Sequence, residues 1–413
     1  MKRLTAVFVA ALVLVAAGGV ATPVAAGAGA AQDATEGSFP LTETDATGTE
    51  VTVDGEPERI VTLAPSAAQT LWELNASGKV VGVSDNADYL DGFAEKEVVS
   101  EGLSYDTETI VGLEPDLVLA PDAVADDVVT SLRDSGLTVY NFGPTANFSE
   151  LYEKTRLTGQ LAGECAAADA TVADMRERVT TIEDAVADEE RPGAFYSFFG
   201  FTAGANTFID SIMTTAGTEN VADTEMGIDG FPTEAVSSEV IANNTAAIEW
   251  LVLNSNPASH PTGEVYNQTT ALQQNQTVVV NEDYLNQPAP RTVLAVENIT
   301  RAIHPDAYEA AQASLAADAA TATDASATDT DATTAADETD SSMGGTDSPM
   351  DETDSSMDGT ATEAMEPATD ATDAAAEATS GSGPGFTATA GVLALLAACL
   401  ALLGANRALG LGL

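Results

Sequence analysis

The fold is decided by the stretch Asn147–Asp188, which reads NFSELYEKTRLTGQLAGECAAADATVADMRERVTTIEDAVAD. It contains no proline, and its apolar residues recur at the spacing of an amphipathic helix. Asn147 or Ser149 can cap its start, and a proline-glycine pair follows its end. A helix of roughly 40 residues would be about 60 Å long. Because that length exceeds the average helix several-fold, a break near Gly159 or Gly163 is the alternative.

Segments of similar size flank this stretch on both sides. In each, short apolar runs typical of buried strands alternate with short amphipathic helices, which predicts a mostly parallel sheet covered on both faces. The expected strands are 51–53, 59–63, 79–83, 115–121, 137–140, 194–198, 250–253 and 278–280. The expected helices are 67–74, 106–113, 128–135, 208–216, 237–242 and 293–303.

We therefore expect an α/β fold of two Rossmann-like lobes, residues 40–146 and 191–310, joined by one long rigid α-helix over residues 147–190. In open α/β sheets, ligands bind beyond the carboxyl ends of the strands. Lobes that face each other therefore predict a ligand cleft between those ends. The alternative is a single larger domain on which an ordinary amphipathic helix packs.

Acidic residues far outnumber basic residues in this chain. The chain has 65 Asp and Glu against 14 Lys and Arg, a formal net charge of -51. Such a surface stays hydrated where salt screens charge, so the composition indicates adaptation to very high salt. It also repels phosphate backbones and so argues against nucleic acid as a partner. Cys165 and Cys399 lie in the expected helix and in an apolar tail, which argues against a disulfide or a thiolate metal site.

Both ends of the chain resemble export and anchoring segments. Residues 1–31 have the basic start, apolar run and small residues of a secretory signal peptide. Residues 311–383 are rich in Ala, Thr, Asp and Ser, which predicts a disordered acidic stalk. In residues 384–413, Pro384-Gly385-Phe386 precedes an apolar run of about 18 residues, enough for a transmembrane helix. We therefore expect the residues between the two ends to lie outside the cell.

The carboxy-terminal tail resembles the PGF-type sorting signal of archaeal surface proteins. In that family an archaeosortase removes the tail and the new terminus is attached to lipid. The resemblance therefore implies a lipid anchor on the outer face of the cell membrane. A permanent C-terminal membrane anchor is the alternative.

Residues 39–308 resemble the cobalamin and ferric-siderophore substrate-binding proteins of ABC importers. The resemblance rests on the order and spacing of motifs at residues 59–66 (RIVTLAPS), 80–83 (VVGV), 109–120 (TIVGLEPDLVLA) and 290–293 (PRTV). It implies a monomeric protein that captures a small molecule and delivers it to an ABC permease dimer with cytoplasmic ATPase subunits. No cofactor is implied, and the ligand is expected to be cobalamin or a related corrinoid.

The expected ligand positions resemble those of cobalamin binders. The resemblance implies ligand contacts at Ser66, Tyr89, Phe201, Phe231, Asp283, Tyr284 and Arg291. Aromatic side chains supply large rigid contact area to a flat macrocycle. Each aromatic residue could instead belong to the core, and Arg291 could cap the last expected helix. This chain departs from the pattern because no tryptophan follows Ala120 and Gln287 stands where a basic residue is expected.

Glu108 and Glu239 occupy corresponding expected helices, one in each lobe. The resemblance implies that this pair docks onto arginines of the permease. Carboxylate–guanidinium pairs are short and directional, which suits such positioning. The alternative is that both are merely solvated glutamates of an acidic surface.

Other classes of function find less support in the residues. His260 and His304 are the two histidines, and neither has a partner at catalytic or metal-ligand spacing, so we expect no enzyme activity. A structural or adhesive surface protein would suit the stalk and anchor, but these features specify only a location. A ferric siderophore or haem is the alternative ligand. Siderophores are often anionic, whereas the expected cleft offers little positive charge besides Arg291.

Overall fold

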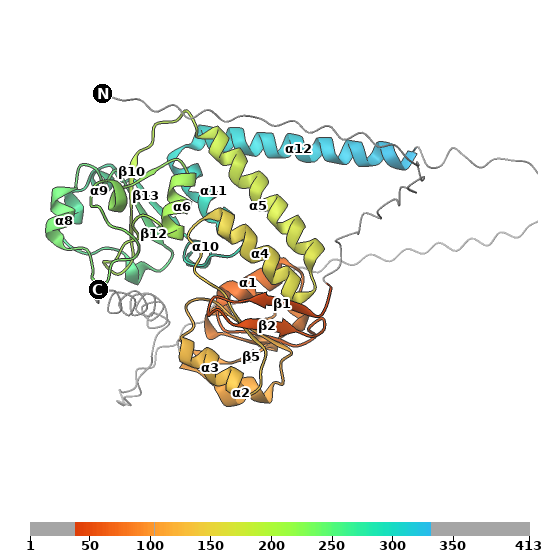
Figure 1. The fold of residues 1–413 in the computed structure, drawn as a ribbon. Helices are drawn as coiled ribbons and strands as arrows, with labels where there is room; N and C mark the ends of the chain where they lie inside the picture. The colour runs from red at the N-terminus through yellow and green to blue at the C-terminus, as the bar shows by residue number, and fades with distance from the viewer. Residues whose placement is uncertain (1–37, 103, 332–413) are drawn as a thin grey trace, which may run out of the picture. The chain divides into compact units, whose positions relative to one another are not determined.

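The computed structural model describes residues 38–102 and 104–331 (Figure 1). The expected signal peptide, the stalk beyond residue 331 and the sorting segment at 384–413 lie outside these residues. Within the described parts, no helix is both long and apolar enough to cross a membrane. Two separate parallel sheets organise these residues, which confirms the expected α/β fold with two lobes.

The first lobe is built on a five-stranded parallel sheet in the order β5-β4-β3-β8-β9. Its strands are β3 (Ile60–Thr62), β4 (Val80–Val83), β5 (Glu97–Val98), β8 (Leu117–Ala120) and β9 (Val139–Asn141). Helix α1 (Pro65–Glu73) covers one face, and α2 (Thr107–Gly112) and α3 (Asp126–Asp134) cover the other. Successive residues of β3 alternate, so that Ile60 packs with α1 and Val61 packs with α2 and α3. Because both faces are covered, the central strands are continuous apolar runs.

Short antiparallel pairs complete the first lobe. Strand β1 (Leu41–Thr44) pairs with β2 (Glu50–Val53), and β6 (Ser100–Glu101) pairs with β7 (Ser104–Tyr105). Val53 of β2 is buried against the α1 face of the sheet. Of these strands, the sequence predicts only β2, because the others are too short or too exposed to show a clear apolar pattern.

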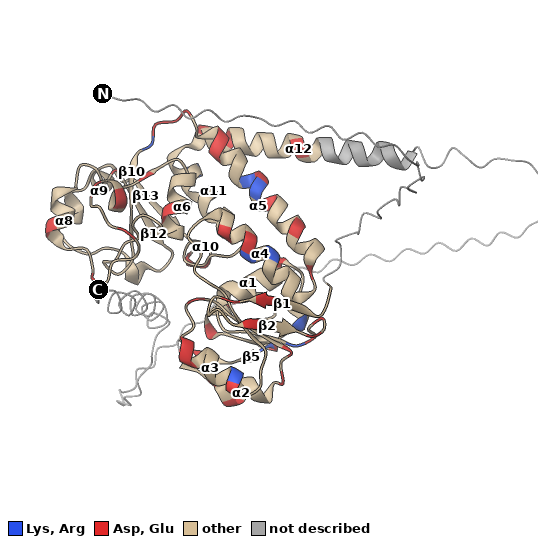
Figure 2. Cartoon of the chain, viewed as in Figure 1, with Lys and Arg blue, Asp and Glu red and all other residues tan. Residues whose placement is uncertain are grey.

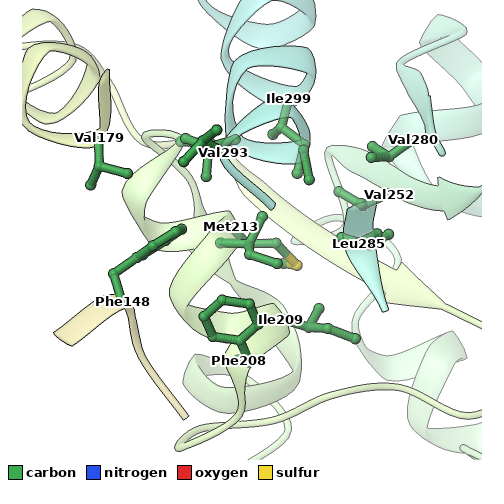
Figure 3. Close-up of a cluster of buried hydrophobic side chains, with 14 of the residues drawn as sticks. Phe148, Val179, Phe208, Ile209, Met213, Val252, Val280, Leu285, Val293 and Ile299 are labelled. Atoms are coloured by element: carbon green, nitrogen blue, oxygen red, sulfur yellow. The ribbon is translucent and has the colours of Figure 1, made fainter. Parts of the chain in front are cut away.

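The second lobe is built on a four-stranded parallel sheet in the order β11-β10-β12-β13. Its strands are β10 (Gly193–Ser197), β11 (Glu219–Asn220), β12 (Trp250–Asn254) and β13 (Thr277–Val280). Its helices are α6 (Phe208–Thr215), α7 (Val221–Thr224), α8 (Ser238–Asn243), α9 (Thr270–Gln274), α10 (Glu282–Leu285) and α11 (Thr292–Ile303). Helices α6 and α11 cover one face, where Phe208, Val252 and Ile299 belong to a shared core (Figure 3). Helices α7, α8 and α9 cover the other face.

Helices α4 (Phe148–Ala162) and α5 (Cys165–Ala185) replace the expected single long helix. Gly163 follows α4 in the left-handed conformation, at φ +79, which L side chains rarely adopt. The prediction of one rigid helix is therefore wrong, and the alternative of a break at Gly163 is correct. Asn147 caps α4 as expected, since its Oδ1 accepts the Glu150 N–H at 3.0 Å.

α4 and α5 pack side by side and form a helical hairpin that connects the cores of the two lobes (Figure 1). Phe148 at the start of α4 belongs to the second-lobe core, whereas Leu161 near its end belongs to the first-lobe core. The chain then returns along α5, whose Met175 packs in the second-lobe core. A Cβ at Gly159 would lie 2.4 Å from the Ala168 Cβ, so the hairpin leaves no room for a side chain there.

Helix α12 (Pro305–Asp331) extends the chain beyond the expected end of the second lobe at residue 310. Ala311, assigned from the sequence to the stalk, is 1% exposed and belongs to the second-lobe core. The following residues are rich in alanine, which has the highest helix propensity. The expected start of a disordered stalk at residue 311 is therefore wrong.

Candidate functional site

Unpaired polar groups gather where strands of the first sheet end. Thr62 Oγ1, Ser84 Oγ and Asn141 Nδ2 are buried and have no hydrogen-bond partner among the described residues. They stand at the end of, or directly after, β3, β4 and β9. Buried polar groups are normally satisfied, and the carboxyl edge of a parallel sheet is where such folds bind ligands. This edge is therefore the candidate functional region of the first lobe.

Segments of the two lobes are joined by direct hydrogen bonds, and we call this contact the interlobe seam. The first lobe contributes α1 and Tyr89, and the second contributes residues 283–291, which follow β13. Gln69 of α1 is 0% exposed. Its Nε2 donates to the Tyr89 hydroxyl at 2.9 Å and to the Asp283 carbonyl oxygen at 3.2 Å. Its Oε1 accepts the Arg291 N–H at 3.0 Å.

Two further side-chain bonds complete the seam. The Tyr89 hydroxyl donates to Gln287 Oε1 at 3.1 Å. Arg291 Nε donates to Glu73 Oε1 at 2.6 Å, and Glu73 lies one helical turn beyond Gln69 on α1. The Arg291 and Glu73 side chains are 28% and 32% exposed, so their ion pair contributes at most about 1 kcal/mol. Arg291 is the N-cap residue of α11, but its side chain makes no capping hydrogen bond there. The side chain pairs with Glu73 across the seam instead.

Burial and neighbouring carboxylates raise the pKa values of two acidic residues at the seam. Burial, then Glu282 and Asp88, raise the pKa of Asp283 to about 6, against an opposing effect of Arg291. Burial and Asp88 also raise the pKa of Glu282. Burial raises the pKa of Tyr89, whose hydroxyl therefore stays neutral. Asp283 can consequently donate a hydrogen bond below about pH 6 and only accept one above it.

The structure brings together three of the residues expected to contact ligand: Tyr89, Asp283 and Arg291. Phe231 and Tyr284 are half-buried, and both pack against the second-lobe core. The packing of these two rings agrees with the alternative that each aromatic residue belongs to the core. A direct role of each residue in ligand binding stays a prediction.

The other two expected ligand residues lie on loops or helix ends that follow strands. Phe201 is half-buried in the loop after β10, where its N–H donates to the Phe198 carbonyl oxygen at 2.9 Å. Ser66 is buried in the first turn of α1, and its carbonyl oxygen accepts the Thr70 hydroxyl at 2.8 Å. Among the described contacts, none joins Phe201 or Ser66 to the seam.

Sequence reasoning missed Gln69 and Glu73 altogether. The available signal was weak, because they are only two long polar side chains, one turn apart, in the helix PSAAQTLWE. Gln287 was noted for departing from an expected basic residue, and the structure assigns it a bond to Tyr89. In each case the partner comes from the opposite lobe, over 190 residues away in the chain.

A buried lysine stands near the ends of β8 and β9. Lys154 of α4 has no hydrogen-bond partner for its Nζ among the described residues, and the amine lies 5.6 Å from the Phe142 ring centroid. Burial lowers the pKa of Lys154, and the charge of Asp122 opposes that effect. Burial also raises the pKa of Asp122. The Lys154 amine has therefore lost hydration that no hydrogen bond among the described residues replaces.

Glu108 and Glu239 occupy matching positions, each in the first turn of its helix and each exposed. Asp106 caps α2 by accepting the Thr109 N–H, and Ser237 caps α8 in the same way. Acidic positions outnumber basic ones over the described ribbon (Figure 2), so exposure alone does not distinguish this pair. Permease docking by these glutamates stays a prediction.

Comparisons with known proteins agree with this architecture. A family model described as periplasmic binding protein matches residues 60–292. A cobalamin-binding protein of Halobacterium salinarum is 43% identical over 279 residues, which span 65% of this chain and 75% of the relative. The uncharacterized ABC transporter substrate-binding lipoprotein YvrC of Bacillus subtilis is 26% identical over 281 residues, 66% of this chain and 88% of the relative.

Solved structures show the same fold. The periplasmic haem-binding protein RhuT of Roseiflexus has a TM-score of 0.54 at 22% identity, covering 62% of this chain and 99% of that one. The periplasmic vitamin B12-binding protein BtuF of Vibrio cholerae has a TM-score of 0.52 at 24% identity, covering 62% and 98%. The family match spans more than half of the sequence, and the two-lobed fold agrees with it. The chain therefore belongs to the periplasmic binding protein family.

Proposed function

We propose that this protein is the extracellular substrate-binding component of an ABC importer, and that it captures cobalamin or a related corrinoid for the membrane permease. The interlobe seam carries the proposal. It joins Tyr89 of the first lobe to Asp283 and Arg291 of the second, through Gln69. A ligand placed between the lobes, beyond the carboxyl ends of the strands, would contact residues of both.

The choice of corrinoid is supported by two independent observations. The Halobacterium relative, 43% identical, is described as a cobalamin-binding protein. The seam also holds few free cations, since Arg291 pairs with Glu73 while Asp88, Glu282 and Asp283 lie near it. Such a site suits a ligand held by shape and by neutral amide groups on its rim.

Haem or a ferric siderophore is the second candidate ligand. It is favoured by the fold neighbour RhuT, which is described as haem-binding. Both candidates keep the role of an importer binding protein, and neither requires catalysis by this chain. We propose a binding role without enzyme activity because the seam pairs its polar groups with one another and presents no nucleophile beside a base.

The docking and anchoring parts of the proposal rest on other regions. Glu108 and Glu239 would contact the permease, since they are exposed at equivalent helix starts of the two lobes. The carboxy-terminal PGF segment would tether a monomer to the outer face of the cell membrane through lipid. The Bacillus relative, described as a substrate-binding lipoprotein, supports a lipid-tethered binding protein.

The test is calorimetric titration of the full chain, in detergent and high salt, with cyanocobalamin, haem and a ferric hydroxamate. We expect saturable binding of the corrinoid with a Kd of about 1 μM or tighter. Selective binding of haem or the ferric complex would show that the corrinoid is the wrong ligand and would leave the proposed importer role standing. Failure of all three to bind would refute the proposal.

A further inference from the structure

Gln69 joins the two lobes through both ends of its side-chain amide. Its side chain is buried, yet its amide has a partner for both N–H groups and for its oxygen. The amide orientation follows from the partners themselves. The Arg291 N–H can only donate and the Asp283 carbonyl can only accept, so Oε1 must face the first and Nε2 the second.

The bonds of Gln69 also determine the orientation of Tyr89. The Tyr89 hydroxyl accepts from Gln69 and donates to Gln287, so both of its hydrogen-bond directions are used within the seam. The ring is thereby held between α1 and the segment that follows β13. Loss of the Gln69 amide would leave the Tyr89 hydroxyl with one partner and would leave the Asp283 carbonyl without its partner from α1.

The neighbouring ion pair cannot replace Gln69. Glu73 and Arg291 are about one-third exposed, and salt screens such pairs within a few ångströms at high ionic strength. Hydrogen bonds made by a fully buried amide are far less sensitive to salt. In a chain with a net charge of -51, a neutral side chain at this position also avoids adding another carboxylate beside Asp88, Glu282 and Asp283.

We infer that Gln69 is a positioning residue: it holds the two lobes in register and orients Tyr89 and the Asp283–Arg291 segment for ligand capture. This inference rests on the proposed binding function. Gln69 acts through the residues it bonds. The interlobe seam is on this basis a preformed part of the binding site.

The variant Gln69→Leu removes all three bonds with little change in volume. We expect cyanocobalamin binding to weaken about tenfold or more, since at least one buried partner loses its hydrogen bond. Thr70→Val is the matched control, because Thr70 is equally buried on α1 but bonds only within that helix. The control should lower thermal stability slightly and leave the corrinoid Kd within about twofold.

Two further variants separate positioning from a general loss of stability. Gln69→Glu keeps an acceptor for the Arg291 N–H, but an ionised carboxylate cannot donate to the Asp283 carbonyl oxygen and adds a buried charge beside Asp283, so it should weaken binding at least as much as Gln69→Leu. Tyr89→Phe should weaken binding less in the Gln69→Leu background than in wild type, because Gln69 and Tyr89 act as a unit. The two effects of Tyr89→Phe on the Kd should differ by about threefold or more. Equal corrinoid affinity of wild type and Gln69→Leu, or Gln69→Glu that binds as tightly as wild type, would overturn the inference.

Hydrogen exchange of the ligand-free protein decides the question even if no corrinoid binds. In Gln69→Leu the Arg291 amide and its neighbours in residues 283–291 should exchange faster, whereas Thr70→Val should leave them unchanged. Unchanged exchange in Gln69→Leu would overturn the inference. Absence of binding by wild type to both corrinoid and haem would instead refute the proposed function.

Discussion

Asp283→Asn should make the folded protein more stable than wild type at neutral pH, and this advantage should vanish in acid. The pKa of Asp283 rises from 3.8 to about 6 on folding, chiefly through burial. Folding therefore takes up a proton between these values, so wild type gains stability as the pH falls and loses it as the pH rises through about 6. Asparagine cannot ionise, so the variant lacks this penalty at every pH.

The size of the effect follows from the shift and from the exposure of Asp283. A shift of about two pKa units corresponds to about 3 kcal/mol, at about 1.4 kcal/mol per unit. Asp283 is only half-buried, and salt screens its charged neighbours, so we expect about 1 kcal/mol at pH 7. Most of this difference should disappear between about pH 7 and about pH 4.

The assay is urea unfolding at fixed high salt over that pH range, with wild type, Asp283→Asn and Asp54→Asn compared at each pH. Asp54 lies in the exposed turn after β2 and serves as the control for removing one acidic charge. Parallel pH dependences of wild type and Asp283→Asn would refute the reasoning. They would mean that the Asp283 carboxylate remains well hydrated beside Asp88 and Glu282.

Three other predictions concern packing, buried charge and docking. Gly159→Ala should lower the free energy of unfolding by about 1–3 kcal/mol, because the added Cβ would push α4 away from α5. In the control Gly112→Ala the added Cβ meets nothing within 4 Å, so this variant should raise the free energy of unfolding by up to about 1 kcal/mol. Equal effects of the two variants in urea unfolding would contradict this prediction. Lys154→Met removes a buried amine without a hydrogen-bond partner among the described residues and should raise stability by about 1 kcal/mol, increasingly as the pH falls, because burial lowers the pKa of that amine; a loss of stability would mean that the amine and Asp122 stabilise each other. Replacing Glu108 and Glu239 together by glutamine should reduce corrinoid uptake by cells about tenfold and leave the binding affinity unchanged. Replacing an exposed glutamate of α5 is the control and should leave uptake unchanged. Unchanged uptake in the double variant would exclude docking by this pair.

Much of the fold follows from local patterns. Strands such as β8 and β12 are buried on both faces, so they appear in the sequence as uninterrupted apolar runs. The break at Gly163 is harder to predict, because a glycine inside a helical pattern costs only about 1 kcal/mol. Tertiary packing determines the position of the break. Helix α4 ends where Leu161 reaches the first-lobe core, and α5 then returns to the second-lobe core. The same holds for α12, whose alanine-rich composition suits either a helix or a stalk until Ala311 is seen to be buried.

The candidate site was predictable only in part. Tyr89, Asp283 and Arg291 were placed together from a family resemblance, and the structure joins them through shared partners. Gln69 and Glu73 leave no periodic or motif signal, because a side chain that bonds to a distant segment looks like any polar residue on a helix. Interactions across more than 190 residues depend on how both lobes fold, and no local propensity encodes them.

The charge around the seam bears on the choice between corrinoid and haem. At molar salt the Debye length is about 3 Å, so only groups near contact distance influence a bound ligand. Glu282 and Asp88 raise the pKa of Asp283, and Asp88 raises that of Glu282, so these carboxylates lie close to one another. Carboxylates that already resist ionisation would be perturbed further by the propionates of haem. The neutral amides around a corrinoid can instead donate to ionised carboxylates and accept from a protonated Asp283, so we expect the same acidic seam to bind a corrinoid in preference to haem.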